Sequence, residues 1–89
     1  MGGYRIITTR RFLRHLKRLE GEVGERILDA VLEVSERPYL GSKLIFDERR
    51  LYKFRVGDYR IIYEIDEENK AVLFLVVDHR RRVYREFGS

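Results

Sequence analysis

The segment Leu51-Tyr-Lys-Phe-Arg-Val-Gly-Asp-Tyr-Arg-Ile-Ile-Tyr63 decides the fold, because it predicts a β-hairpin of fixed register. Gly57-Asp58 forms a two-residue turn with glycine first, the order that a type II′ turn prefers. So short a loop determines which residues of the two strands face each other. The predicted pairs are Val56–Tyr59, Arg55–Arg60, Phe54–Ile61, Lys53–Ile62 and Tyr52–Tyr63.

The two faces of this hairpin differ in character, because side chains alternate along a strand. One face collects the aromatic and aliphatic side chains of Tyr52, Phe54, Val56, Tyr59, Ile61 and Tyr63. Lys53, Arg55 and Arg60 share the other face. Like charges directly opposite each other destabilise a sheet, and a bound polyanion would turn that repulsion into attraction. The hairpin alone leaves two interpretations open, a solvated charged face or a phosphate-binding surface.

The rest of the chain predicts an α+β fold. We expect a strand over 4–7, a helix that is capped by Thr8 or Thr9 and ends near Leu19, and a second helix over 22–36 that Pro38 ends. Phe12, Leu13, Leu16 and Leu19 form the apolar stripe of the first helix. Further strands are expected over 43–46, 51–56, 59–65 and 71–77, and a short helix within 79–87. The predicted architecture is an N-terminal strand and an antiparallel helical hairpin, packed on one face of a mostly antiparallel four- to five-stranded sheet. No helix is expected on the other face.

Composition restricts the classes of protein to which the chain can belong. Its 89 residues suit a single domain over 1–89. There is no cysteine, which excludes disulfides and thiolate metal sites, and no apolar run reaches the roughly 18 residues that span a bilayer. We therefore expect a cytoplasmic protein without a membrane partner. A net charge of +4 favours an anionic partner weakly, but the basic residues crowd the C-terminal half.

Two segments carry a resemblance to a known family, the hairpin Leu51–Glu64 and the ending Val77-Asp-His-Arg-Arg-Arg-Val-Tyr84. With the order strand, helix, helix, strands, they make the chain resemble the RelE family, within the RelE/ParE superfamily of toxins from type II toxin–antitoxin systems. The resemblance implies a ribosome-dependent mRNA endoribonuclease that inhibits translation and needs no metal or other cofactor. It also implies a RelB-like antitoxin, the ribosome and mRNA as partners.

The resemblance also implies which residues form the site. Carried over by position, the catalytic residues are Lys53, Arg55, Arg60, Arg80 and Tyr84. Arg49, Arg50, Arg81 and Arg82 are expected to bind RNA, and of the tail arginines only Arg80 is expected to point into the site. We expect His79 to have a structural role, because no second histidine is suitably placed for a histidine-based cleavage.

RNA cleavage by internal attack needs a base for the 2′-hydroxyl, stabilisation of a doubly charged phosphorane, and an acid for the leaving 5′-oxygen. Arginine suits the middle task, because its planar fork binds two phosphate oxygens. Lysine and tyrosine have ordinary pKa values of about 10, and neighbouring cations lower them. In this hypothesis Arg60 stabilises the transition state and Arg55 and Lys53 bind phosphate. Lys53 or Tyr84 is the base, and Arg80 lies near the leaving oxygen.

Two alternatives stay open. The chain could be a ParE-like toxin, which acts on DNA gyrase without cutting nucleic acid, or an inactive relative that binds RNA or protein. ParE-like members generally lack the full set of basic residues with the tyrosine, whereas this chain has candidates for each. The sequence therefore favours the endoribonuclease.

Overall fold

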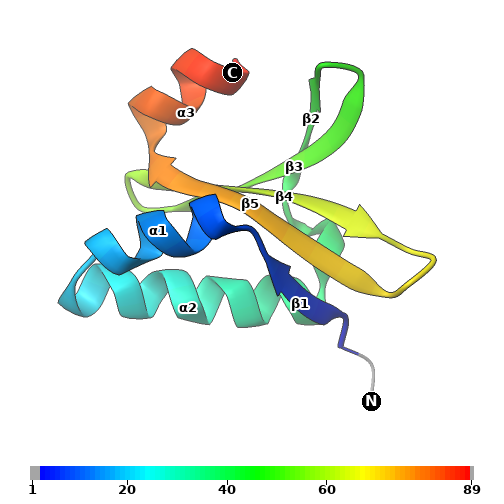
Figure 1. Ribbon diagram of the computed structural model, residues 1–89, viewed down its shortest axis with the longest axis horizontal. Helices are drawn as coiled ribbons and strands as arrows, with labels where there is room; N and C mark the ends of the chain where they lie inside the picture. Colours follow the sequence, from blue (N-terminus) through cyan, green and yellow to red (C-terminus); the bar gives the residue numbers. More distant parts are fainter. Residues whose placement is uncertain (1–2, 89) are drawn as a thin grey trace.

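The computed structural model describes residues 3–88, so Met1, Gly2 and Ser89 lie outside the described residues. Its elements are β1 (Arg5–Thr8), α1 (Arg10–Arg18), α2 (Gly21–Glu36), the 3-10 helix η1 (Pro38–Leu40), β2 (Ser42–Phe46), β3 (Arg49–Val56), β4 (Tyr59–Asp66), β5 (Ala71–His79) and α3 (Arg80–Phe87). The five strands form one sheet in the order β1-β5-β4-β3-β2 (Figure 1). β1 pairs in parallel with β5, and the other neighbours pair antiparallel. The predicted α+β architecture is confirmed.

The β3–β4 hairpin has the predicted register. Every expected pair is present, from Val56–Tyr59 beside the turn to Tyr52–Tyr63. Gly57 has a φ of 59°, a left-handed value that glycine adopts without strain and that a type II′ turn requires at its first position. Two-residue turn geometry thus places Arg55 directly opposite Arg60, as expected.

α1 and α2 cover one face of the sheet (Figure 1). The Thr9 hydroxyl accepts a hydrogen bond from the Phe12 N–H at 3.0 Å and caps α1, as predicted. The core between helices and sheet consists of Phe12, Ile27, Ala30, Val31, Val34, Ile61, Tyr63, Val72, Phe74 and Val77. The prediction for Leu13 was wrong, because its side chain is 44% exposed. Successive helical residues are turned by about 100°, so a helix with Phe12 at the centre of its buried face carries Leu13 to the edge of that face.

Tyr63 fixes the start of β2 against β3 and β4. Its side chain is fully buried, and its hydroxyl donates to the Pro38 carbonyl at 2.7 Å and accepts from the Gly41 N–H at 3.0 Å. Burial raises the pKa of Tyr63 to about 12. A Cβ at Gly41 would lie 2.6 Å from the Tyr63 hydroxyl oxygen and 2.8 Å from the Lys53 carbonyl oxygen, so only glycine lets the backbones approach this closely.

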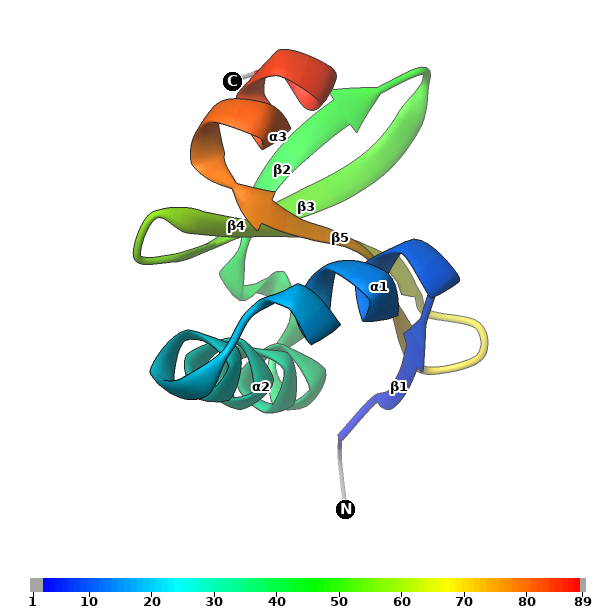
Figure 2. The same cartoon turned by 60° about the vertical axis from the view of Figure 1, so that its left-hand side comes forward.

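The opposite face of the sheet is partly covered, contrary to our expectation that no helix shields it. α3 lies on the side of the sheet away from α1 and α2 (Figure 2). Val83 and Phe87, four residues apart on α3, pack into a second core with Leu44, Leu51, Ile62 and Val76. The two apolar side chains of an otherwise charged tail thus turn the same way and hold the helix on the sheet.

None of the helices within residues 3–88 has both the length and the apolar character needed to cross a membrane.

Candidate functional site

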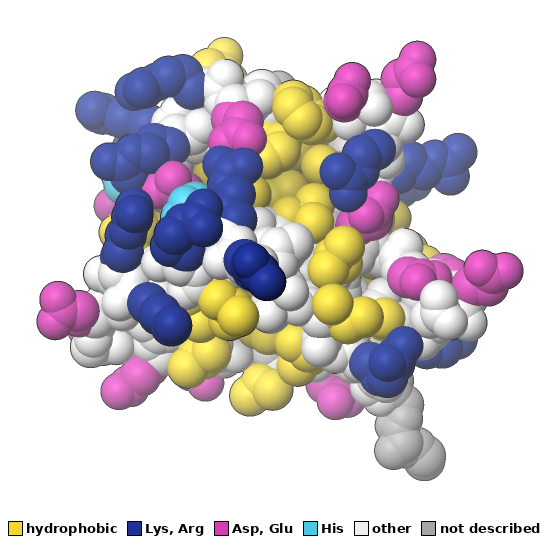
Figure 3. Space-filling model, in the orientation of Figure 1, with side chains coloured by type: hydrophobic (Ala, Val, Ile, Leu, Met, Phe, Trp, Pro, Cys, Tyr) yellow, Lys and Arg dark blue, Asp and Glu magenta, His cyan; other side chains and the backbone are white. Residues whose placement is uncertain are grey.

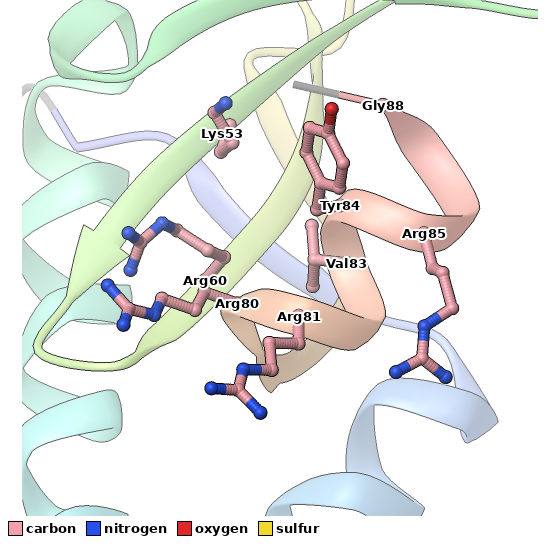
Figure 4. A pocket seen from close by; sticks show the side chains of 8 residues that line it. All are labelled: Lys53, Arg60, Arg80, Arg81, Val83, Tyr84, Arg85 and Gly88. Carbon is pink, nitrogen blue, oxygen red and sulfur yellow. The ribbon is translucent and has the colours of Figure 1, made fainter.

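A groove opens where α3 meets the charged face of the β3–β4 hairpin. It has a volume of about 520 Å³, and its walls are Lys53, Arg60, Arg80, Arg81, Val83, Tyr84, Arg85 and Gly88. Figure 4 shows Lys53 and Tyr84 on opposite sides of the opening, with Arg60 and Arg80 side by side nearer the β3–β4 turn. The structure therefore brings together Lys53, Arg60, Arg80 and Tyr84, which the sequence analysis singled out from distant parts of the chain.

Arg60 lies close to two other positive charges, those of Arg55 and Arg80. Partial burial, followed by the positive charges of Arg55 and Arg80, lowers the pKa of its guanidinium. Its Nη1 donates to the carbonyl oxygens of Gly57 and Tyr59, each at 2.9 Å, which holds the side chain along the turn. The remaining guanidinium donors are available to an anion, and an anion bound here would offset the repulsion among the cations.

Two hydrogen bonds position the start of α3 beside the hairpin. The Arg80 N–H donates to the Asp58 carbonyl at 2.8 Å, so α3 begins at the β3–β4 turn. His79 caps α3, because its Nδ1 accepts from the Arg81 N–H at 3.2 Å. Its ring also meets that of Tyr59 edge-on, with centroids 5.9 Å apart. These contacts agree with the structural role that the sequence analysis expected for His79.

Arg55 and Arg82 carry charge beside the groove without lining it. Arg55 faces Arg60 across the hairpin and is exposed, so it adds to the positive field of the site. Arg82 turns to another side of α3 and forms an ion pair with Asp78 at 3.0 Å.

Arg49 and Arg50 lie at the far end of the hairpin. Arg49 forms an ion pair with Glu64 at 2.8 Å, on the same face of the sheet as Lys53. Arg50 is exposed, and strand alternation puts it on the face of Tyr52. The structure thus does not gather these two arginines, expected to bind RNA, with the groove residues.

Two further arginines line the groove. The prediction that only Arg80 among the tail arginines points into the site did not anticipate Arg81, which lines the groove although its guanidinium points away from Lys53 and Tyr84 in Figure 4. The sequence analysis missed Arg85. This residue lines the groove, and its side chain points away from Lys53 in Figure 4. Helical spacing pairs Arg80 with Tyr84 and Arg81 with Arg85, four residues apart in each case, but it does not by itself show that the second pair borders the same groove.

The side chains of the groove are suited to binding phosphate. Guanidinium forks bind phosphate oxygens in pairs, and they stabilise negative charge that develops on a phosphate. The phenol of Tyr84, 64% exposed, can reach a ligand bound between the arginines and Lys53. The groove therefore suits a phosphodiester.

Comparison with known proteins identifies the family. The family described as "ParE toxin of type II toxin-antitoxin system, parDE" matches residues 6–84 of the chain. The chain belongs to the RelE/ParE family of type II toxins. A curated member of this family, Toxin RelG of Mycobacterium tuberculosis, is 36% identical to this toxin in an alignment of 83 residues that covers 86% of this chain and 95% of RelG.

Solved structures support the same assignment. The toxin in the complex RelBE2 from Mycobacterium tuberculosis superposes with a TM-score of 0.81 at 29% identity, over 90% of this chain and 94% of that one. The match in the archaeal RelE–RelB complex from Pyrococcus horikoshii has a TM-score of 0.77 at 26% identity, over 90% of this chain and 98% of that one. The RelE-family toxin suggested by the hairpin and tail motifs is thus confirmed.

Proposed function

We propose that this toxin is a ribosome-dependent mRNA endoribonuclease of the RelE type, which inhibits translation in the cytoplasm. The observation that carries the proposal is the groove in which Lys53, Arg60, Arg80 and Tyr84 surround a space suited to a phosphodiester. Membership of the RelE/ParE family supports it. The reaction needs no metal in this proposal, because the side chains of the groove can perform each step.

The proposed reaction is an internal transfer within the RNA. The 2′-oxygen loses its proton to a base and attacks the adjacent phosphorus, while the bond from phosphorus to the 5′-oxygen breaks. The 5′-oxygen takes a proton from the general acid, which is whichever of Lys53 and Tyr84 is not the base, and leaves as a hydroxyl, and the phosphate remains as a 2′,3′-cyclic diester. The protein has to hold the reacting atoms in line and stabilise the negative charge of the phosphorane.

We assign these tasks to residues that line or border the groove. Arg60, which is held against the turn, stabilises the charge on the phosphorane, and Lys53 and Arg55 bind the phosphate. Arg80 lies beside Arg60 and contacts the leaving oxygen. Lys53 or Tyr84 takes the 2′-proton, since they face each other across the opening. Arg81 extends RNA binding along α3, and the exposed Arg49, Arg50 and Arg82 add weaker contacts to its backbone.

Single-turnover cleavage of mRNA on programmed ribosomes tests the proposal. Arg60→Ala and Arg80→Ala should each slow the chemical step by roughly 100- to 1,000-fold at saturating ribosome, as removal of a donor to a developing oxyanion does. Arg82→Ala is the matched control, because it removes the same charge from α3 at a side chain bound to Asp78 outside the groove. Wild-type rates for both groove variants would refute the assignment of the site.

A second candidate function has support, because the family description that matches the chain is that of the ParE toxin. A ParE-like toxin would act on DNA gyrase without cutting RNA, and an inactive relative would only bind RNA or protein. Expression of the wild type separates these possibilities. Arrested translation with cleaved mRNA supports the nuclease, DNA damage supports the ParE-like activity, and neither effect indicates the inactive relative.

We also propose a RelB-like antitoxin as a partner. The solved structures from Mycobacterium tuberculosis and Pyrococcus horikoshii are toxin–antitoxin complexes of this family, which supports the proposal. The segment Arg81–Phe87 is a suitable target, because it is basic, borders the groove and is held by few buried side chains. An antitoxin segment that folds on this helix would block RNA from the groove.

A further inference from the structure

The outer surface of α1 and α2 carries a stripe of exposed leucines. Leu13 on α1 and Leu28 and Leu32 on α2 are 44%, 50% and 58% exposed. Figure 3 shows hydrophobic side chains gathered over these helices, with basic side chains toward α1 and acidic side chains along the edge of α2. Grouped exposed leucines of this kind indicate a contact surface rather than isolated surface residues.

The leucine stripe runs between two rows of opposite charge. Arg10, Arg14 and Lys17 are exposed on α1, and Glu25, Asp29 and Glu36 are exposed on α2. Spacings of three and four residues place the acidic row beside Leu28 and Leu32 on α2. Within residues 3–88, none of these six side chains takes part in an ion pair. Both rows are therefore free to pair with another molecule.

We propose that this surface binds a second copy of the chain. A two-fold contact uses the same patch on both molecules, so the patch must be complementary to itself. If the two-fold axis runs along the leucine stripe, the leucines of the copies meet, and α1 of each copy faces α2 of the other. The basic row of one molecule then lies against the acidic row of its partner. α1 and α2 run antiparallel (Figure 1), and only Leu19 and Glu20 join them. Arg14, four residues before the end of α1, is therefore level with Glu25, four residues after the start of α2. A two-fold axis along the stripe keeps these levels, so Arg14 of one copy comes near Glu25 of the other.

The charge pattern favours a second copy over other occupants. The acidic row of α2 would repel a nucleic acid backbone, and a peptide of one charge would match only one of the two rows. The stripe lies in the α1–α2 layer, on the other side of the sheet from α3 and the groove (Figure 2). A dimer formed here leaves the groove open, and the inference does not rest on the proposed nuclease function.

Sedimentation equilibrium of the purified toxin tests the inference. The wild type should dimerise reversibly with increasing concentration, and raising salt from about 50 mM to about 500 mM should weaken the dimer, because it screens exposed charges. The double variant Leu28→Ser/Leu32→Ser should stay monomeric with an unchanged circular dichroism spectrum. Ile45→Ser is the matched control, since it removes an exposed apolar side chain from β2 and should leave the dimer intact. A wild type that stays monomeric up to about 1 mM, a standard-state free energy of about −4 kcal/mol, would overturn the inference.

Variants in which the charge of one row is reversed give a sharper test. Arg14→Glu/Lys17→Glu makes both rows acidic, and Glu25→Lys/Asp29→Lys makes both rows basic. Each variant alone should dimerise at least about 100-fold more weakly than the wild type, because like rows then face each other. An equimolar mixture should restore a dimer that contains one copy of each. Failure of the mixture to associate would overturn the inference, as would capture of the wild-type stripe by RNA or an antitoxin while the toxin itself stays monomeric.

Discussion

Phe87→Ala measures how strongly the second core holds α3, and with it the groove. Phe87 is buried among the residues of that core, and its ring meets Phe46 edge-on with centroids 4.7 Å apart. Burial of a phenylalanine side chain contributes about 1.5–3 kcal/mol, and an aromatic pair adds about 0.5–1.5 kcal/mol. We therefore expect the variant to lose about 2–4 kcal/mol of the free energy that keeps α3 on the sheet.

The loss of stability should appear first in α3. An eight-residue helix is not stable in water by itself, so α3 should detach while the α1–α2 core persists. Hydrogen exchange by NMR should show α3 amides losing protection before those of β4 and β5, and urea unfolding should report the loss in overall stability. Tyr84→Ala is the control, because it removes an exposed ring from the same helix and should change stability by no more than about 0.5 kcal/mol. Wild-type protection of α3 in Phe87→Ala would refute the role given to the second core.

Other predictions concern the hairpin, the β2 junction and the β4–β5 turn. Tyr63→Phe leaves the Pro38 carbonyl and the Gly41 N–H without their buried partner, so urea unfolding should show a loss of about 1–3 kcal/mol. Arg55→Ala removes the repulsion across the hairpin and should raise stability by up to about 0.5 kcal/mol at low salt, an increase that high salt should abolish. Hydrogen bonds from Lys70, Tyr39 and Tyr4 lower the pKa of Glu67 to about 2, so the stability it contributes is complete above its unfolded pKa of about 4.5 and is lost as pH falls toward 2. Glu67→Gln should remove this part of the acid dependence, and an NMR titration midpoint for Glu67 near 4.5 would contradict the assignment.

The sequence was sufficient for the hairpin because its turn admits one geometry. Gly57 at the first position of a two-residue loop leaves one register, and that register determines the neighbours of Lys53, Arg55 and Arg60. The two helices could be predicted from the spacing of their apolar residues and from Thr9 as the cap of α1. These signals are local, so a single sequence carries them completely.

The packing of α3 could not be predicted in the same way. Its charged residues outnumber its apolar ones, so the tail gave only a weak sign that Val83 and Phe87 face a second core. Without the axis of the helix, the directions of Arg81 and Arg85 were undetermined. The prediction that Leu13 belongs to the buried stripe of α1 was wrong for a related reason. A nine-residue helix has few apolar positions from which to locate the centre of its buried face.

The parallel pairing of β1 with β5 has a consequence for synthesis. It joins Arg5 to Ala71, so the ends of a long stretch of chain must meet before the sheet is complete. β5 and α3 leave the ribosome after the helix pair and the β3–β4 hairpin, and α3 carries Arg80 and Tyr84. A growing chain can form the helix pair and the hairpin early, but it has no complete groove until α3 has been synthesised. This topology therefore delays assembly of the groove until well after the chain has begun to fold.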